Sequence, residues 1–234
     1  MLNQINLQER ALDISRGCFE SGRVRAPRLL YDGALVSTFD PSEEVVGEGD
    51  ATENFYVVLK GVFRGVKFTR DGRRQIIAFY ASGDMCGLES TATHEVTVEA
   101  VNEGSMAVLS RQACGARMKA DPQFNEGMFE AATRSLALAV EHSLMLYHSS
   151  AEERLAWFLQ MLLARSSDPA MRRPTLELVM MRQDIADYLG LTIETVSRTL
   201  TCLRERGLIK LLTTHRVEIC KVGLLERLAS ADRE

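Results

Sequence analysis

Short apolar runs alternate with turn residues over residues 27–120. The runs lie at 34–36, 44–46, 55–59, 62–68, 75–79, 96–101 and 105–109. Short strands at such regular spacing, bounded by Gly and Asp, are typical of a small all-β sandwich or barrel. The sequence Arg70-Asp71-Gly72 between two alternating runs indicates a hairpin turn. We therefore predict an all-β domain at 27–120, with a helical segment before it at 1–26 and a short helix at 112–119.

A long helical pattern covers residues 121–149. Asp121 can cap its N-terminus, and Pro122 stands in the first turn, where proline is tolerated. Mostly apolar residues recur every three or four positions at Phe124, Met128, Ala132, Leu136, Ala139, Ser143 and Leu146. A second row widens this stripe and consists of Phe129, Ala131, Leu138 and Met145. A helix of this length has two apolar faces to bury: one can pack on the β domain, and the simplest partner for the other is a parallel copy of the same helix. We expect a homodimer through this helix, and the alternative is a connecting helix in a monomer.

Residues 150–234 form a third piece. Ser150 with Glu153 three residues later is a capping box, which predicts a helix that begins there and ends before Asp168. A short strand is expected at 176–180, followed by two short helices with a tight turn. A hairpin around Thr213–His215 and a last helix at 223–229 complete the chain. The three pieces together predict an α+β protein.

The segment 182–200 has the pattern of a helix-turn-helix. Ala186 is small enough for the second helix to approach the first, and Gly190 gives the backbone the freedom for a tight turn. Thr192 is a natural N-cap for the second helix. The apolar contacts between the two helices are expected from Ile185, Leu189, Val196 and Leu200. This motif indicates that the second helix enters the major groove of DNA.

The second helix divides into a core face and an outward face. The core face is expected to hold Val196, Thr199, Leu200 and Leu203, and the outward face Glu194, Ser197, Arg198, Thr201 and Cys202. Glu194 can accept a hydrogen bond from cytosine N4, and Arg198 can donate two to guanine. The alternative is an exposed helix in which Glu194 and Arg198 pair with each other. We predict that the outward face reads DNA bases.

The net charge of the whole chain argues weakly against nucleic-acid binding, but the charge differs between its N-terminal and C-terminal parts. The chain has 28 Lys and Arg against 32 Asp and Glu, a net charge of −4, whereas nucleic-acid binders usually show a basic footprint. Residues 151–234 hold 13 Lys and Arg against 12 Asp and Glu, so the acidity lies in residues 1–150. The basic residues in or beside the helix-turn-helix and its hairpin are Arg182, Arg198, Lys210, Arg216 and Lys221.

These features resemble the CRP/FNR family of bacterial transcription regulators over about residues 30–230. The marks are Gly49-Asp50 before residues 56–61, Gly83-Asp84 with Gly87, residues 151–156, and Glu194-Thr195-Val196-Ser197-Arg198. The resemblance implies an N-terminal β-roll of the cyclic-nucleotide-binding type at 27–120, a dimerisation helix at 121–149 and a winged helix-turn-helix at 150–234. The last mark is similar to the FNR/FixK branch of the family.

The resemblance also implies how DNA is bound. In this branch Glu194, Ser197 and Arg198 would read the bases of a palindromic TTGA-type site, in an activator that contacts RNA polymerase. Contacts to the DNA backbone are expected from Arg182, Gln183, Thr192, Thr195, Lys210 and Arg216. The family usually places Ser or Thr before the first helix of the motif, where this chain has Met181. That helix end is expected to be less stable by about 1 kcal/mol unless another group caps it.

Two departures from the family bear on cofactors. Gly87-Leu88 and about His94-Glu95 stand where a cyclic-nucleotide pocket needs Gly-Glu and Arg-Ser, so an acidic residue replaces a phosphate-binding cation. Cys18 is the only cysteine near the N-terminus, where the oxygen sensors of the family cluster three of their four iron–sulfur ligands. We therefore expect no cofactor. The alternative is a ligand- or redox-gated member with a small molecule or haem in the β-roll, for which His94, His142 and His148 are the candidate ligands.

The five cysteines are scattered, which suits free thiols in the cytoplasm. Cys86, Cys114 and Cys220 are expected to be small packing residues. Cys202 lies on the outward face one turn after Arg198, and it is a candidate for redox control because an oxidised sulfur there would repel phosphates; the alternative is an ordinary exposed residue. Apolar runs are too short for a membrane span, no secretory signal is visible, and the sequence has no enzyme signature.

Overall fold

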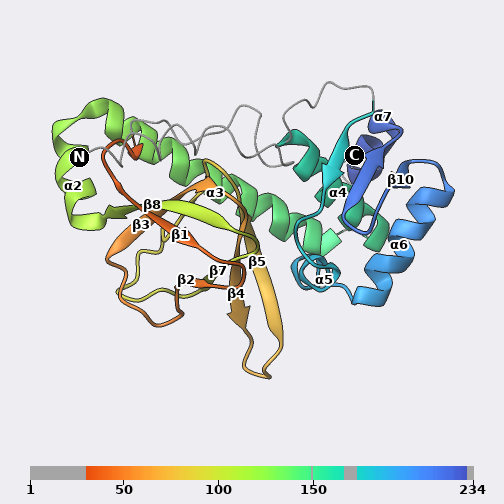
Figure 1. Cartoon of the computed structure of the whole chain (residues 1–234), viewed down its shortest axis with the longest axis horizontal. Coiled ribbons are helices and arrows are strands. Elements are labelled where there is room, and N and C mark those ends of the chain that lie inside the picture. Colours follow the sequence, from red (N-terminus) through yellow and green to blue (C-terminus); the bar gives the residue numbers. More distant parts are fainter. Residues whose placement is uncertain (1–29, 149, 166–172, 231–234) are drawn as a thin grey trace. The chain divides into compact units, whose positions relative to one another are not determined.

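The computed structural model describes residues 30–148, 150–165 and 173–230 (Figure 1). The helical segment expected at 1–26 therefore lies outside the described residues. The chain forms two compact units. Among the described residues, the first unit holds 30–67 and 79–135, and the second holds 68–78 together with 136–165 and 173–230. The division falls within the long helix and not at its ends.

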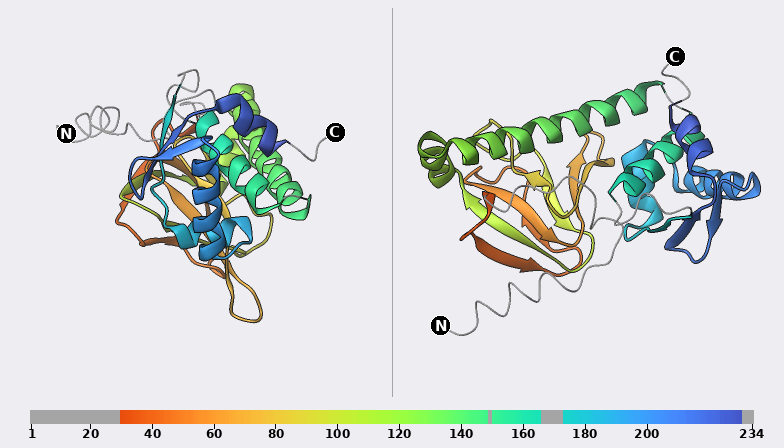
Figure 2. Two further views of the ribbon diagram at one scale, coloured as in Figure 1. Left: turned by 90° about the vertical axis from the view of Figure 1, so that its right-hand side faces the viewer. Right: turned by 90° about the horizontal axis from the view of Figure 1, so that it is seen from above.

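The N-terminal strands form two four-stranded sheets, which confirms the predicted all-β domain (Figure 2). One sheet has the order β1-β8-β3-β6, with bounds β1 Leu35–Phe39, β8 Gly104–Ser110, β3 Asn54–Lys60 and β6 Met85–Cys86. The other has the order β2-β7-β4-β5, with bounds β2 Glu44–Val46, β7 Thr97–Ala100, β4 Phe63–Phe68 and β5 Arg74–Tyr80. The prediction missed β6, because two residues are too few to show a period.

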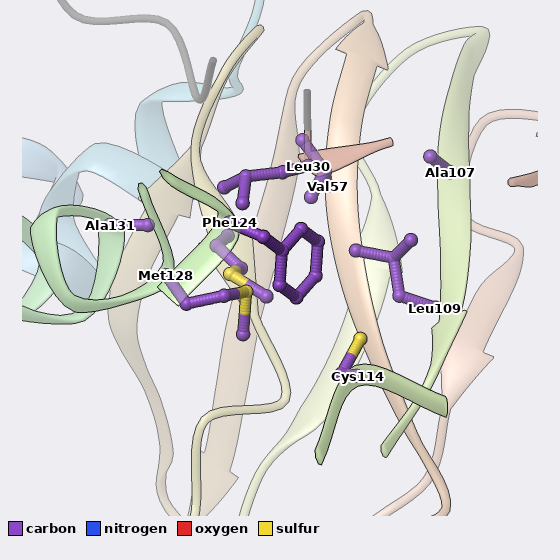
Figure 3. Packing of buried hydrophobic residues seen from close by; sticks show 9 residues of the cluster. Leu30, Val57, Ala107, Leu109, Cys114, Phe124, Met128 and Ala131 are labelled. Atoms are coloured by element: carbon purple, nitrogen blue, oxygen red, sulfur yellow. The ribbon is translucent and has the colours of Figure 1, made fainter. Parts of the chain in front are cut away.

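The alternation of side chains along β3 separates two hydrophobic clusters. Tyr56 and Val58 point into one cluster with Phe63 and Met106. Val57 points to the other face of its sheet, where it packs with Phe124 and Met128 of the long helix (Figure 3). Because successive side chains of a strand point to opposite faces, one strand supplies both clusters.

Helix α2 spans Arg111–Ala120 and helix α3 spans Pro122–His148. Asp121 caps α3 as predicted, since its Oδ1 accepts hydrogen bonds from the backbone N–H groups of Gln123 at 3.0 Å and Phe124 at 3.1 Å. The first turns of α3 are buried through Phe124, Met128 and Ala131. One apolar face of α3 therefore does pack on the β domain, and it draws on both of the expected rows.

The two apolar rows expected along α3 do not match its faces. Leu136 belongs to the same predicted row as Phe124, yet 64% of it is exposed while Phe124 is buried. Each four-residue step turns the row by about 40°, so the row drifts around a helix of this length. The large apolar side chains of α3 that are exposed are Phe129, Leu136, Val140, Leu144 and Tyr147.

The C-terminal elements follow the expected order. They are α4 Ala151–Ala164, β9 Thr175–Glu177, α5 Arg182–Leu189, α6 Ile193–Glu205, β10 Ile209–Leu211, β11 Arg216–Ile219 and α7 Val222–Ala229. The capping box of α4 is present: the Ser150 hydroxyl accepts from the Glu153 N–H at 3.4 Å, and Glu153 accepts from the Ser150 N–H at 2.6 Å. The strands form a sheet of order β10-β11-β9. None of the described helices is long and apolar enough to cross a membrane.

Candidate nucleic-acid interface

Helices α5 and α6 form the predicted helix-turn-helix. Gly190 ends α5 in the left-handed conformation with φ of +62°, and its N–H bonds to the carbonyl of Ala186. Ala186 is fully buried, as its role at the crossing of the two helices requires. The turn is tight on its outer side as well, because a Cβ on Gly190 would lie 3.3 Å from Arg154 Nη1. Both the conformation and the space therefore favour glycine at this position.

Thr192 caps the second helix as predicted. Its hydroxyl accepts a hydrogen bond from the Thr195 N–H at 3.2 Å and lies 3.1 Å from the Thr195 hydroxyl. The predicted core face of α6 is confirmed, since Val196, Thr199, Leu200 and Leu203 are all buried. The helix is thus fixed at its start and along one side, which holds the opposite side in a defined direction.

Glu194, Ser197 and Arg198 are exposed together on the first two turns of α6. Hydrogen bonds from its own backbone N–H and from the Thr192 side chain lower the pKa of Glu194. Its carboxylate is therefore ionised at neutral pH and is an acceptor only. Within the described part of the chain, no ion pair joins Glu194 to Arg198. The face combines an acceptor, a hydroxyl and a cationic fork, which are the groups that distinguish base edges in the major groove.

The start of α5 is capped by Asp184 and not by Met181. The Oδ2 atom of Asp184 accepts the Met181 N–H at 3.3 Å, and Met181 makes no side-chain cap bond. The Oδ1 atom of Asp184 accepts from Arg74 at 2.8 Å within the same unit, and Arg74 also pairs with Asp187 at 2.8 Å. Asp187 in turn accepts from Gln183 at 2.6 Å. The sequence offered no signal for these contacts with Arg74.

Arg182 connects α5 to the tip of the β10–β11 hairpin. Its Nη2 donates to the carbonyl of Thr214 at 2.9 Å, whereas its Nη1 is buried without a hydrogen-bond partner among the described residues. Burial lowers the pKa of Arg182. Lys210 on β10 and Arg216 on β11 are exposed. The hairpin therefore lies beside α5 as a wing and carries two exposed cationic side chains.

Comparisons with known proteins agree with this arrangement. Residues 178–209 match the family model of bacterial regulatory proteins of the crp family, and residues 36–121 match the cyclic nucleotide-binding domain. The chain is 38% identical to the nitrogen fixation regulation protein FixK of Azorhizobium caulinodans, over 93% of this chain and 88% of that protein. It is 37% identical to FixK of Rhizobium meliloti, over 87% and 92% respectively. The chain belongs to the CRP/FNR family.

A solved structure supports the same assignment. FixK2 from Bradyrhizobium japonicum superposes with a TM-score of 0.75 at 34% identity, covering 83% of this chain and 96% of that one. The FixK-like branch and the α+β architecture expected from the sequence are therefore confirmed. This member of the family is a DNA-binding transcription regulator and not an enzyme.

In this CRP/FNR protein, one loop corresponds to the cyclic-nucleotide pocket of the family. Its side chains are not suited to binding a phosphate. Residues 87–95 include Glu89 and Glu95 but no Lys or Arg. His94 is 2% exposed, and its Nδ1 lies 3.4 Å from Glu89 Oε2. Arg111 reaches this loop, but its Nη2 donates to the carbonyl of Gly87 at 2.6 Å. The carboxylates would repel a phosphate, so the residues present do not fit a cyclic nucleotide.

Cys202 does not lie free on the outward face of α6. It is partly buried, and its Sγ donates to Glu152 Oε1 of α4 at 3.3 Å, while Glu152 also pairs with Arg206. The hydrogen bond to Glu152 is the largest cause that raises the pKa of the Cys202 thiol. The sequence missed this neighbour, which is 50 residues away in the chain. Because the thiolate is the reactive form, this environment disfavours reaction at neutral pH.

The remaining cysteines and histidines are placed as follows. Cys86 and Cys114 are buried, as expected for packing residues, and Cys220 is partly buried. Cys18 lies outside the described residues. His142 is buried against Tyr188, where burial lowers its pKa. Among the described residues, no group of three or more His, Cys, Asp and Glu side chains is arranged to hold a metal ion.

Proposed function

We propose that this chain is an activator that binds a palindromic TTGA-type operator as a homodimer and reads it with Glu194, Ser197 and Arg198. The observation that carries the proposal is the common exposure of these three side chains on a capped helix whose other face is buried. Glu194 would accept from cytosine N4, and Arg198 would donate to guanine O6 and N7. In a dimer the two copies of α6 would enter successive major grooves about 34 Å apart.

The contacts to the DNA backbone are assigned to the start of α5 and to the wing. Arg182, Gln183, Lys210 and Arg216 are the proposed phosphate ligands there, and Lys210 and Arg216 are exposed. Thr192 and Thr195 are proposed on the same side at the start of α6, where their hydroxyls also serve the cap. Lys210→Ala should weaken binding to all DNA sequences alike. It should also reduce the slope of log binding constant against log salt concentration by about one.

The proposed dimer interface is the uncovered apolar face of α3. Leu136 and Leu144 are 64% and 52% exposed, and Tyr147 is 83% exposed. Paired copies of α3 would remove these side chains from water, which is a strong driving force for association. Leu136→Glu should convert the dimer to a monomer in sedimentation experiments, whereas Lys119→Gln on the exposed end of α2 should leave the dimer intact. The functional division we propose is 1–26, 27–120, 121–149 and 150–234.

We also propose that the regulator needs no bound cofactor, contacts RNA polymerase and works in the cytoplasm. The acidic 87–95 loop supports the first point. The test is equilibrium binding of the purified protein to a palindromic TTGA-type duplex in air, with no effector added. Tight binding is the expected result. Binding that appears only after a small molecule is added would contradict the cofactor-free proposal.

One observation favours the second candidate, a regulator gated by a small molecule or haem in the β domain. Both ring nitrogens of His94 and the Oε2 of Glu89 are buried with no hydrogen-bond partner among the described residues. Such groups are rare in a finished core and are the kind that a polar ligand satisfies. An absorption spectrum of the purified protein without a Soret band would dismiss haem.

A further inference from the structure

Three carbonyl groups at the end of α5 have partners from outside the helix-turn-helix. The last carbonyls of a helix have no partner within it and need one elsewhere. Here His142 Nε2 donates to the Tyr188 carbonyl at 2.8 Å. Arg154 Nη1 donates to the Leu189 carbonyl at 3.0 Å and lies 3.5 Å from that of Gly190. The turn between α5 and α6 is therefore held by side chains from α3 and α4.

The same guanidinium group also holds the last turn of α3. Arg154 Nη2 donates to the carbonyl of Leu146 at 2.9 Å, so one rigid fork joins the end of α3 to the end of α5. Gly190 leaves room for this approach, because a Cβ there would lie in tight contact, 3.3 Å from Arg154 Nη1 and 3.4 Å from Leu146 Cδ2. Lysine is a poor substitute for this contact, since all its donors lie on one nitrogen, whereas the guanidinium uses Nη1 and Nη2 for carbonyls on two helices.

A stack of buried rings fixes the orientation of His142. Its ring is stacked on Tyr188 with centroids 4.0 Å apart and an angle of 8° between the planes, and Trp157 of α4 is stacked 6.0 Å away. Burial lowers the pKa of His142, so the ring is neutral at neutral pH. A carbonyl can only accept, so the proton of the neutral ring must be on Nε2.

His142 lies on the side of α3 opposite to the proposed dimer face. Val140, Leu144 and Tyr147 are exposed, whereas His142 is 7% exposed within the same two turns. These turns of α3 therefore present one side to a partner copy and fasten the other to α5. Helices α5 and α6 contact each other, and Ala186 and Val196 are fully buried, so the position of α5 determines that of α6.

We infer that His142 and Arg154 are positioning residues that fix the recognition helix relative to the dimerisation helix, and thereby set the spacing between operator half-sites that the dimer accepts. This inference rests on the proposed dimeric reading of a palindrome. Neither side chain needs to touch DNA. Their effect is on the distance and angle between the two copies of α6, because each copy is fastened to its own α3.

The test measures binding to three duplexes: the palindrome, the same half-sites with two base pairs added between them, and a single half-site. His142→Phe keeps a stacked ring but loses the donor, and Arg154→Lys keeps the charge but loses the fork. His142→Gln retains an N–H donor at the corresponding position. Arg227→Lys, on the exposed side of α7, is the matched control for the arginine change. Dimer mass and thermal unfolding are recorded for each protein.

The expected result is a preference for the correct spacing that falls by tenfold or more in His142→Phe and in Arg154→Lys, with the half-site affinity unchanged. His142→Gln and Arg227→Lys should keep the wild-type preference. An unchanged preference in His142→Phe, or an equal loss on all three duplexes, would overturn the inference. If the wild-type protein does not prefer the palindrome over the half-site, the proposed function itself fails, which is a separate outcome.

Discussion

Replacing Asp184 with alanine should destabilise the second unit by about 3.5–4 kcal/mol. The side chain of Asp184 is only 3% exposed, and it accepts from the Arg74 guanidinium at 2.8 Å and from the Met181 N–H at 3.3 Å. Removing one member of a buried ion pair costs about 3–5 kcal/mol. The lower end applies here, because Arg74 is 27% exposed and keeps its second partner, Asp187. Loss of the helix cap adds about 0.5–1 kcal/mol.

The assay is urea unfolding followed by tryptophan fluorescence. The chain has one tryptophan, Trp157, whose ring lies 6.3 Å from that of Tyr188 on α5, so its signal reports on this unit. Asp184→Asn should lose about half as much stability as Asp184→Ala, since the amide oxygen can still accept from Met181. A loss below about 1 kcal/mol in Asp184→Ala would refute the reasoning, because neither the ion pair nor the cap could then be as described.

Three further outcomes are expected. Ser150→Ala should reduce the free energy of unfolding by about 1 kcal/mol through loss of the α4 cap, measured by the same urea titration; no change would contradict the capping box. The pKa of His142 is lower in the folded state than its unfolded value of 6.5. Its contribution to stability is therefore fully present above pH 6.5 and is lost as the pH falls toward the folded pKa. Thermal unfolding between pH 7.5 and 5 should show a falling melting temperature in the wild type and a smaller fall in His142→Gln. Mass spectrometry should show that Cys202 is alkylated slowly at pH 7.5 and faster in Glu152→Gln. If peroxide inhibits the DNA binding of wild type and Cys202→Ser equally, Cys202 is not the site of redox control.

The sequence predicted what depends on local patterns. The caps at Asp121, Ser150 and Thr192 were all expected, because a cap is decided by residues within three positions of one another. The core face of α6 was likewise expected from its helical period. The motifs that resemble the CRP/FNR family then indicated how these elements combine into a β-roll, a dimerisation helix and a winged helix-turn-helix.

Contacts between residues far apart in the sequence were not predictable. Arg74 and Asp184 are 110 positions apart, and His142 and Tyr188 are 46 apart. Neither pair has a periodic or spacing signal, since each depends on how whole elements pack. The contact of Cys202 with Glu152 was missed for the same reason, because the helical wheel of α6 does not include residues of α4. The faces of α3 were misjudged because the rows drift along a long helix.

The most direct test of the central claim is base-specific binding by Arg198→Ala. Wild type and variant are titrated, in air and without effector, against a palindromic TTGA-type duplex and against the same duplex with the guanine of each half-site replaced. The account predicts that Arg198→Ala loses about 1–3 kcal/mol on the palindrome and no longer distinguishes the two duplexes. Affinity and discrimination equal to those of the wild type would show that the exposed face of α6 does not read the operator.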